Sequence, residues 1–395
     1  MHGCGPFRKL PLDGVHVVDF GHWVAGPLAA EILANLGASV IKVEQFRGDP
    51  LGRSLPGPYG VVNRGKYSLA ANLKAPGAHE VVRRLVMWSD VVTSNYRPGV
   101  ADRLGFGTDR LAAIDPSVVV LESTAYGNGG PSADRPGFDP IFLAKSGHAH
   151  RAGGSDGPPV CATRLGAIDS GTGMLGAFAA ATGLYRSRRT GTGGFVGVSL
   201  LDASLFLMGE VERDSTGAVV GPATLDRDRT GVHPAEALYQ LQDCWAAIVA
   251  TSETARRSLV CALGLSAMAS QPSRCWGQSE HDAISAVLCQ LPLNEVEHRL
   301  AGSDVSVVPC ATDAKARTLS NAALIDAGLV VPAEEPASGC FTGFPVTFEH
   351  TQTLGPEAAH VPRLGEHTDT ALHMIGFTQA EIIGLRAANV VTGEA

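Results

Sequence analysis

The sequence is poor in aromatic residues and has no concentrated positive charge. Phe, Trp and Tyr make up 6% of its 395 residues, and the formal net charge is −8. The densest basic cluster is the short group Arg186, Arg188 and Arg189. Nucleic-acid and anionic-membrane binding both need clustered positive charge. Neither partner is therefore expected, although a small anionic ligand could still meet a few local cations.

Long apolar runs and paired cysteines are also missing. No apolar stretch reaches the roughly 18 residues of a membrane-spanning helix, and the opening segment MHGCGPFRKLPLDG lacks the apolar core of a secretory signal. The 8 cysteines are scattered, without CxxC or another metal-binding spacing. We therefore expect a cytoplasmic protein with reduced thiols, no membrane segment and no metal.

What the sequence does contain is a regular alternation of strand-like and helix-like segments. The Val-rich run at 15–20 (VHVVDF) is typical of a buried parallel strand. Gly26 and Pro27 open a helical pattern over 28–36, and Gly37 ends it. Further strands are expected at 40–44, 90–94, 117–122 and 195–200, and helices at 79–87, 100–104, 141–146, 171–186 and 201–213. This order predicts an α/β fold with a doubly wound parallel sheet.

Two interruptions divide the chain. Residues 126–163 are rich in Gly, Pro and Asp, which is typical of long and often functional loops. Residues 216–230 (TGAVVGPATLDRDRT) predict a linker. We therefore expect four regions, which are the N-terminal part of a large domain (1–215), the linker (216–230), a small α+β domain (231–330) and a C-terminal segment (331–395).

A candidate ligand site follows the first strand, in the turn FGHWVAGP at 20–27. In α/β sheets, ligands bind at the carboxyl ends of strands, beside glycine-rich turns of this kind. The spacing of Gly21 and Gly26 is not GxGxxG, and Pro27 occupies the helix start, so a nicotinamide or flavin site is not expected. A plain helix start explains much of the same pattern.

A second candidate is Asp169, in the segment TRLGAIDSGTGM at 163–174. Exposed N–H groups and the positive end of the helix dipole favour an Asp at a helix N-terminus, and we expect them to keep it ionised. An ionised carboxylate can attack an activated acyl group, and the neighbouring glycines leave space for a large thioester. From the residues alone, a helix cap and a nucleophile both remain open.

Scattered cations could meet phosphates. Arg64 and Lys66 flank a glycine, and Arg97 lies in the segment NYRPG at 95–99, which follows a strand and opens a helix. Helix-terminal N–H groups and a fork of positive charge could hold a phosphate at either place. Solvated surface charge is the alternative at both, and the residues alone do not define a reaction.

Six segments in this order resemble one known family. They are LDGVHVVDFGHWVAGPLAAEILANLGASVIKVE (12–44), NRGKYSLAANLK (63–74), SNYRPGVADRLGFG (94–107), RPGFDPIFLAKSG (135–147), GAIDSGTGMLGAFAAATGLYRSRRTGTGG (166–194) and PRLGEHTDTALHMIGF (362–377). The chain is thereby similar to the class III coenzyme A transferases, which include formyl-CoA transferase and carnitine CoA-transferase; region 235–320 matches weakly. The resemblance implies a Rossmann-like large domain to which the C-terminal segment returns, and two chains threaded as interlocked rings.

The resemblance also implies a mechanism. The nucleophile of this family is the Asp of the segment that matches GAIDSGTG, which is Asp169 here. Its carboxylate is expected to pass CoA from an acyl-CoA donor to a free carboxylic acid through an aspartyl anhydride and an aspartyl-CoA thioester. Acyl-CoA is then a substrate, and no permanently bound cofactor is expected.

By the same resemblance, further residues are expected around Asp169. The substrate pocket would be lined by His22, Trp23, Val24, Ala25 and Phe138. Coenzyme A would be bound by Arg47 (or Gln45), Lys66, Asn95, Tyr96 and Arg97. Some positions depart from the family. Val24 stands where formyl-CoA transferase has Gln, which indicates a different, bulkier acceptor; a glycine run before the small domain is reduced to Gly231, and the usual Asp-Gly is Asp243-Cys244.

Two alternatives remain. An α-methylacyl-CoA racemase moves an α-proton with a His/Asp pair, but Phe138 stands where its His would be, and a phenyl ring cannot exchange a proton. His148 or His150 could replace it only if the loop were re-routed. The other alternative is a non-catalytic subunit, because some transferases of this family pair two unlike chains. We expect an intertwined homodimer, with a heteromer as the alternative.

Overall fold

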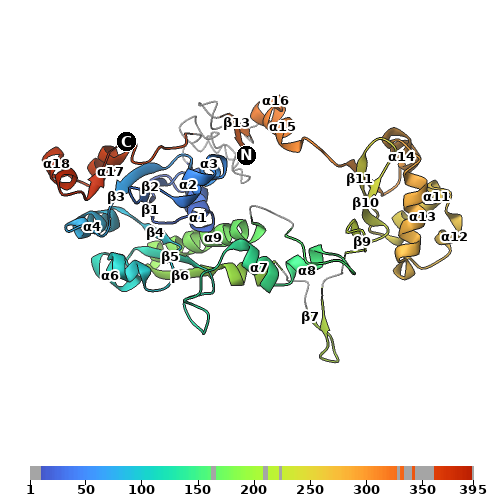
Figure 1. The fold of residues 1–395 in the computed structure, drawn as a ribbon, viewed down its shortest axis with the longest axis horizontal. Coiled ribbons are helices and arrows are strands. Elements are labelled where there is room, and N and C mark those ends of the chain that lie inside the picture. Colours follow the sequence, from blue (N-terminus) through green and yellow to red (C-terminus); the bar gives the residue numbers. More distant parts are fainter. Residues whose placement is uncertain are drawn as a thin grey trace, which may run out of the picture. The chain divides into compact units, whose positions relative to one another are not determined.

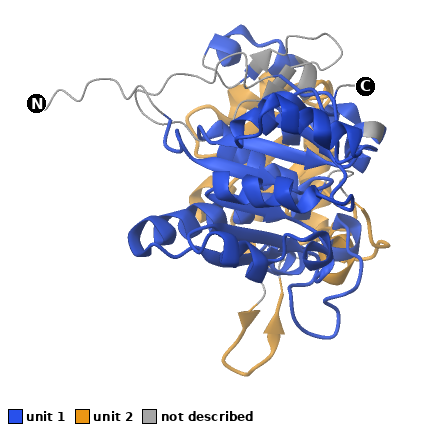
Figure 2. Cartoon of the chain, turned by 90° about the vertical axis from the view of Figure 1, so that its left-hand side faces the viewer, with its two compact units in different colours: residues 1–142, 165–207, 315–395 blue, residues 143–164, 208–314 orange. Residues whose placement is uncertain are grey.

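The computed structural model describes residues 10–161, 166–207, 212–221, 225–326, 330–332, 340–342 and 360–393. The chain divides into two compact units, coloured separately in Figure 2. Unit 1 comprises residues 1–142, 165–207 and 315–395, and unit 2 comprises 143–164 and 208–314. The sequence-based boundaries differ from this division, because 143–164 and the expected linker fall in unit 2, which ends at 314.

Unit 1 is built on a seven-stranded sheet (Figure 1). Its strands are β1 (His16–Asp19), β2 (Ser39–Glu44), β3 (Tyr67–Ala71), β4 (Val91–Ser94), β5 (Val119–Thr124), β6 (Gly194–Ser199) and β15 (Val391–Thr392). The spatial order is β15-β3-β2-β1-β4-β5-β6; β1 to β6 are parallel, and β15 pairs antiparallel with β3. The predicted parallel sheet is confirmed, and its strand order reverses between β1 and β4.

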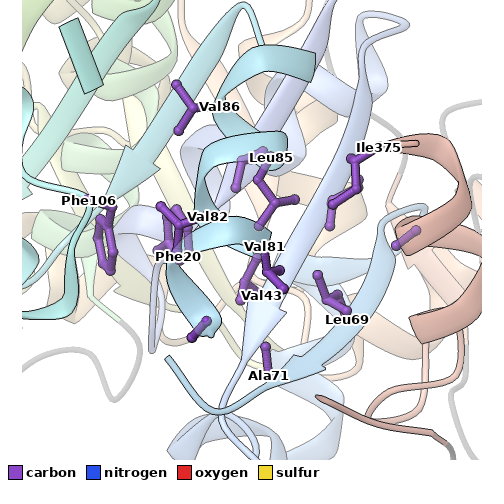
Figure 3. Close-up of a cluster of buried hydrophobic side chains, with 14 of the residues drawn as sticks. Phe20, Val43, Leu69, Ala71, Val81, Val82, Leu85, Val86, Phe106 and Ile375 are labelled. Carbon is purple, nitrogen blue, oxygen red and sulfur yellow. The ribbon is translucent and has the colours of Figure 1, made fainter. Parts of the chain in front are cut away.

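Helices cover both faces of this sheet because successive strand residues point to opposite sides. On one face, Val43 and Leu69 from the strands pack with Leu85 of α4 (Ala78–Trp88) and with Ile375 (Figure 3). On the other face, Val17 belongs to a cluster with side chains of α1 (Ala25–Asn35) and α9 (Ala167–Thr190). The predicted doubly wound arrangement therefore has a core on each side of the sheet.

The remaining helices of the chain's sheet-bearing part are short. They are α2 (Pro50–Ser54), α3 (Pro56–Asn63), α5 (Val100–Leu104), α6 (Thr108–Ile114), α7 (Asp139–Lys145), α10 (Leu200–Phe206), α15 (Ala314–Leu319), α16 (Ala322–Asp326), α17 (Thr368–Met374) and α18 (Gln379–Ala387). A small separate ladder pairs β13 (Val330–Pro332) with β14 (Cys340–Thr342). Among the described residues, no helix is long and apolar enough to cross a membrane.

Unit 2 has its own antiparallel sheet and its own core. The sheet has the order β12-β11-β10-β9, with strands β9 (Gly231–His233), β10 (Glu236–Gln240), β11 (Trp245–Val249) and β12 (Ser306–Pro309). Its helices are α8 (His148–Ala152), α11 (Glu253–Ala262), α12 (Ser266–Ala269), α13 (Gln278–Leu288) and α14 (Leu293–Leu300), with a 3₁₀ turn at Ser273–Cys275. A hairpin of β7 (Glu212–Arg213) and β8 (Val219–Val220) occupies part of the expected linker.

Candidate active site

The carboxyl ends of β1 and β4 meet where the strand order reverses, which is where open α/β sheets bind ligands. One side chain, Asn95, fastens the loops that follow these two strands. Its Oδ1 accepts the His22 N–H at 2.8 Å, and its Nδ2 donates to the His22 carbonyl at 2.6 Å. Gly26 makes room, since a Cβ there would lie 2.9 Å from Asn95 Cγ. The amide that we expected to contact CoA therefore braces the turn.

The turn between β1 and α1 holds Trp23 in a conformation that bulky residues rarely adopt. Its φ is 62°, in the left-handed region. The Trp23 N–H donates to Asp49 Oδ1 at 3.2 Å, and the Lys42 ammonium bonds both the Gly21 carbonyl and Asp49. The Trp23 ring meets Phe138 edge-on at 5.9 Å, with 41% and 51% of the two residues exposed. A buried charge network thus holds an exposed apolar pair in place.

His22 and Tyr96 form a second contact between the two loops. His22 Nε2 lies 2.5 Å from the Tyr96 hydroxyl, and the rings are edge-on. Burial lowers the pKa of His22, with the nearby Lys42 charge adding to this effect, and burial raises the pKa of Tyr96. Near neutral pH, a neutral imidazole therefore faces a protonated phenol, and neither supplies a charge to a ligand.

Lys66 lies in the interior rather than at the surface. Its ammonium is fully buried and contacts Asp19 at 2.7 Å, the Pro27 carbonyl at 2.8 Å and Asn63 Oδ1 at 3.0 Å. Burial lowers the pKa of Lys66 to about 8, opposed by the charge of Asp19. We expected this lysine to contact CoA; in the structure its charge lies inside the protein, where the buried Asp19 carboxylate needs a donor.

Asp169 lies in the first turn of α9 and is half-buried. The helix end is capped by another residue, Asp139 at the start of α7, whose Oδ2 accepts the N–H groups of Ile168 and Asp169, both at 3.0 Å. Gly166 admits this carboxylate, since a Cβ at Gly166 would overlap it. The role of helix cap that remained open for Asp169 therefore belongs to Asp139.

The protonation of Asp169 differs from what the sequence predicted. Burial and, as the smaller cause, the negative charge of Asp139 together raise its pKa to about 7. Desolvation and this like charge oppose the helix dipole that we expected to keep Asp169 ionised. A carboxyl group that titrates near neutral pH in a partly desolvated place is typical of functional sites.

Packing brings the turn, Phe138 and Asp169 into one region of unit 1. Helix α1 packs along α9 so closely that a Cβ at Gly173 would lie 2.8 Å from Leu28 Cδ2. Phe138 joins the two sides, because it contacts Trp23 and immediately precedes the capping Asp139. Val24 and Ala25, which were also expected to line the substrate pocket, are less exposed than Trp23 and Phe138. Val24 is half-buried against the cluster around Leu51, and Ala25 is buried in α1.

Two hollows flank Tyr96. One of about 180 Å³ is lined by Gln45, Phe46, Arg47, Asn72, Leu73, Lys74, Tyr96 and Leu104. The other, of about 340 Å³, contains Arg97 and the acidic side chains Asp102, Asp109 and Glu122. Of the expected CoA ligands, Arg47 and Tyr96 thus share a hollow, whereas Arg97 lies among carboxylates. Lys74 was missed from the sequence, although it lies in a segment that matches the family.

Comparison with known proteins agrees with this architecture. The chain matches the model of CoA-transferase family III over residues 12–368. It is 34% identical to the acetyl-CoA:oxalate CoA-transferase of Acetobacter aceti over 67% of this chain and 69% of that protein. It is 30% identical to the succinyl-CoA--D-citramalate CoA-transferase of Chloroflexus aurantiacus over 96% of this chain and 98% of that protein.

A solved structure shows the same fold. A hypothetical protein from Mycobacterium tuberculosis matches with a TM-score of 0.76 at 25% identity, covering 93% of this chain and 100% of that one. The sheet and these likenesses together define an enzyme of the CoA-transferase class. The chain belongs to CoA-transferase family III.

Proposed function

We propose that this enzyme transfers coenzyme A from an acyl-CoA to a free carboxylic acid through covalent intermediates on Asp169. The position of Asp169 carries the proposal. It is half-buried in the first turn of α9, with a pKa of about 7. Its N–H is capped by Asp139, which follows Phe138 of the exposed Trp23–Phe138 pair. Near neutral pH a substantial fraction of the group is ionised, and partial desolvation leaves that carboxylate less stabilised by water and more reactive.

The proposed exchange has two balanced halves. An Asp169 carboxylate oxygen attacks the thioester carbonyl, the C–S bond breaks, and CoA departs as its thiolate. An aspartyl–acyl anhydride remains on the enzyme. The thiolate then attacks the aspartyl carbon and expels the donor acid as its carboxylate, leaving an aspartyl-CoA thioester. The acceptor carboxylate attacks that thioester, and the same steps in reverse release the new acyl-CoA and restore Asp169. The thioester's free energy is conserved because no water enters.

The nucleotide end of CoA fits the hollow that contains Arg47 and Lys74. Two cations at its rim suit phosphates, and the half-exposed Phe46 beside Tyr96 offers an aromatic face to adenine. The hollow that contains Arg97 is less suited to phosphates because several carboxylates line it. Acyl-CoA therefore acts as a substrate in this proposal, and the chemistry needs no resident cofactor.

The acceptor is a carboxylic acid, and short dicarboxylic acids are the first to screen. Relatives are named for oxalate, D-citramalate and glutarate. A racemase is the second candidate that the family resemblance raised. The residue that precedes Asp139 in the chain is Phe138, whose ring cannot carry a proton. Deuterium exchange at the α-carbon of a chiral acyl-CoA distinguishes the two activities, and we expect none.

We also propose that the active form is a homodimer. Large apolar side chains are exposed on two helices of unit 1, with Met174, Phe178 and Tyr185 of α9 between 62% and 69% exposed and Phe206 of α10 72% exposed. The two helices pack against each other, and exposed apolar patches normally mark protein interfaces. A second copy of this chain is the partner that the family resemblance implies.

The substitution Asp169→Asn tests the proposed reaction. It keeps the size of the side chain but removes the nucleophilic oxygen, so we expect the rate of CoA exchange to fall at least about 10³-fold. The assay measures new thioesters by mass after mixing acyl-CoA donors with free acids. Asp134→Asn, which alters an exposed carboxylate, is the matched control and should retain wild-type rates. Exchange by Asp169→Asn at a comparable rate would contradict the covalent route.

A further inference from the structure

Unit 2 contains a cluster of one imidazole and two carboxylates that the proposed reaction does not use. Asp228 belongs to the loop before β9, whereas His281 and Asp282 lie in the first turns of α13. One potential ligand atom from each residue lies within 4.8 Å of the other two. The two carboxylates are exposed, and the imidazole is buried between the loop and the helix.

The buried His281 has an unpaired ring nitrogen that faces this cluster. Only 7% of the residue is exposed, and its ring stacks on Tyr239 with 4.8 Å between centroids. Its Nδ1 is buried without a hydrogen-bond partner and lies 3.7 Å from Asp282 Oδ1, beyond hydrogen-bond distance. A buried polar atom without a partner is costly, and here it lies beside the Asp282 carboxylate.

A hydrogen-bond chain behind the ring fixes which nitrogen carries the proton. The Thr230 hydroxyl donates to Asp226 Oδ2 at 2.7 Å, so its oxygen can only accept from His281 Nε2, which lies 3.0 Å away. Nε2 therefore carries a proton, and Nδ1, which lies 3.7 Å from Asp282 Oδ1, is left without a hydrogen-bond partner. Metal-binding histidines show this arrangement, with the second ring nitrogen donating to a fixed oxygen.

We propose that Asp228, His281 and Asp282 bind a divalent transition-metal ion of the Zn²⁺ type. Imidazole nitrogen with carboxylate oxygen suits Zn²⁺ better than Mg²⁺ or Ca²⁺, which prefer all-oxygen sites. Bonds of about 2.0–2.2 Å would place the ligand atoms roughly 3.3–3.5 Å apart. The observed separations are somewhat wider, and the exposed carboxylates can close the difference by side-chain rotation. Water would complete the coordination.

Neighbouring charges do not block this site. Arg227 pairs with Asp228 at 3.5 Å, but both side chains are about half-exposed, and such pairs contribute little. Gln278 is a polar neighbour that donates to Asp282 Oδ1 at 2.8 Å. A bound divalent ion would satisfy Nδ1 and both acids at once, and it would tie the loop before β9 to α13.

A similar cluster in unit 1 lacks this feature. His360, Glu366 and His367 also lie close together. However, His367 Nδ1 accepts the Ser68 N–H at 3.2 Å, so the ring's other nitrogen carries the proton and cannot ligate a metal without losing it. Glu366 already accepts from His360 and from the Arg363 N–H. That group forms a hydrogen-bonded set, and of the two clusters only the one in unit 2 contains a buried ring nitrogen without a hydrogen-bond partner.

Titration of the full chain with Zn²⁺ tests the proposal. After treatment with a chelator, calorimetry and metal analysis should show a Zn²⁺ site that Asp228→Asn and Asp282→Asn each weaken at least about 10-fold. Thr230→Val should weaken it as well by releasing the ring tautomer, and Mg²⁺ should not compete. Asp304→Asn, an exposed carboxylate of the same unit, is the control that should bind as wild type.

Two results would overturn the proposal. One is wild-type Zn²⁺ stoichiometry and affinity in both carboxylate variants, which would place any bound zinc elsewhere on the chain. The other is the absence of Zn²⁺ binding to the wild type at micromolar concentrations. Because the CoA exchange assay is not the readout, either result leaves the proposed function of Asp169 unaffected.

Discussion

At the scale of single residues, the site depends on two aspartates that do different work. Asp139, from the start of α7, accepts two backbone N–H groups at the start of α9. Asp169 itself has a raised pKa and no capping role. The capping contact joins residues thirty positions apart, and the raised pKa comes first from burial and then from the charge of that same Asp139. The sequence motif indicated Asp169 as the nucleophile, but its protonation could not be predicted, because it depends on burial and on a carboxylate from another element.

The pH dependence of exchange should report this pair. Because the pKa of Asp169 is raised to about 7, the group gains a proton as pH falls through neutrality, so activity should fall from pH 8 to pH 6. Asp139→Asn removes the like charge but keeps an oxygen that can accept the N–H groups. The acid limb of kcat/KM should therefore move to lower pH, though only modestly, because burial is the larger cause.

A comparison of pH–rate profiles for wild type, Asp139→Asn and Asp134→Asn makes this measurement. The Asp134→Asn profile should superimpose on that of the wild type. An acid limb that stays in place in Asp139→Asn, or that moves to higher pH, would show that Asp139 does not act on Asp169 through its charge.

Lys66 is a second residue whose role depends on three-dimensional context. In the sequence it is one of several cations near a glycine, and the family resemblance assigned it to CoA. In the fold, the loop before β3 turns inward and its ammonium pairs with Asp19. Sequence patterns do not distinguish a surface lysine from one that neutralises a buried carboxylate, because both lie in polar, glycine-containing segments.

At the scale of elements, hydrogen bonds join the turns after β1 and β4 into one structural unit. The strained Trp23 backbone persists because Asn95, Asp49 and Lys42 all bond to the turn. The order β3-β2-β1-β4-β5-β6 places these two turns side by side, although they are about seventy residues apart in the chain. Strand–helix alternation predicted the sheet, but the hydrogen bonds between turns need the strand order, which periodicity does not specify.

Asn95→Ala should loosen the two joined turns after β1 and β4 without altering Asp169 itself. It leaves the His22 N–H and carbonyl without their partner, so we expect a loss of about 1–3 kcal/mol in the free energy of unfolding. KM for acyl-CoA should rise at least several-fold as the turn loosens. Denaturant unfolding and steady-state kinetics measure the two effects.

The matched control is Asn128→Ala, whose exposed amide bonds only the Glu122 side chain. It should change neither quantity appreciably. If Asn95→Ala unfolded and bound acyl-CoA like the wild type, the turn would not depend on this brace.

Element boundaries show where sequence patterns were insufficient. The helix expected at 171–186 extends over Ala167–Thr190, which places Asp169 inside its first turn. The helix start could not be predicted from the sequence, because Gly171 and Gly173 weaken the helical pattern. In the structure, Gly173 is needed for close packing on Leu28. The helix expected at 201–213 ends as α10 at Phe206, and 212–213 form a strand instead.

At the scale of the whole molecule, the two units have separate cores and separate sheets. The small unit was recognised from the interruption near 216–230, but its additional segment 143–164 was not, because loop composition does not reveal which core a segment joins. The C-terminal strand β15 extends the large sheet beside β3, so chain ends far apart in sequence share one layer.

The proposed homodimer predicts a solution mass of twice the 41.0 kDa chain. Phe178→Glu introduces a charge into the exposed apolar face of α9 and should shift the species toward monomer at low concentration. Ile383→Glu, a similarly exposed apolar residue on α18, is the control and should leave the mass unchanged. Light scattering after gel filtration makes the measurement, and a monomeric wild type would contradict the proposal.

The most direct test of the account is to trap the covalent enzyme. The wild type is incubated with acyl-CoA and then with hydroxylamine, and its peptides are analysed by mass spectrometry. The account predicts a hydroxamate on the peptide that contains Asp169, dependent on acyl-CoA and absent from Asp169→Asn. An unmodified Asp169 in enzyme that is turning over substrate would contradict it.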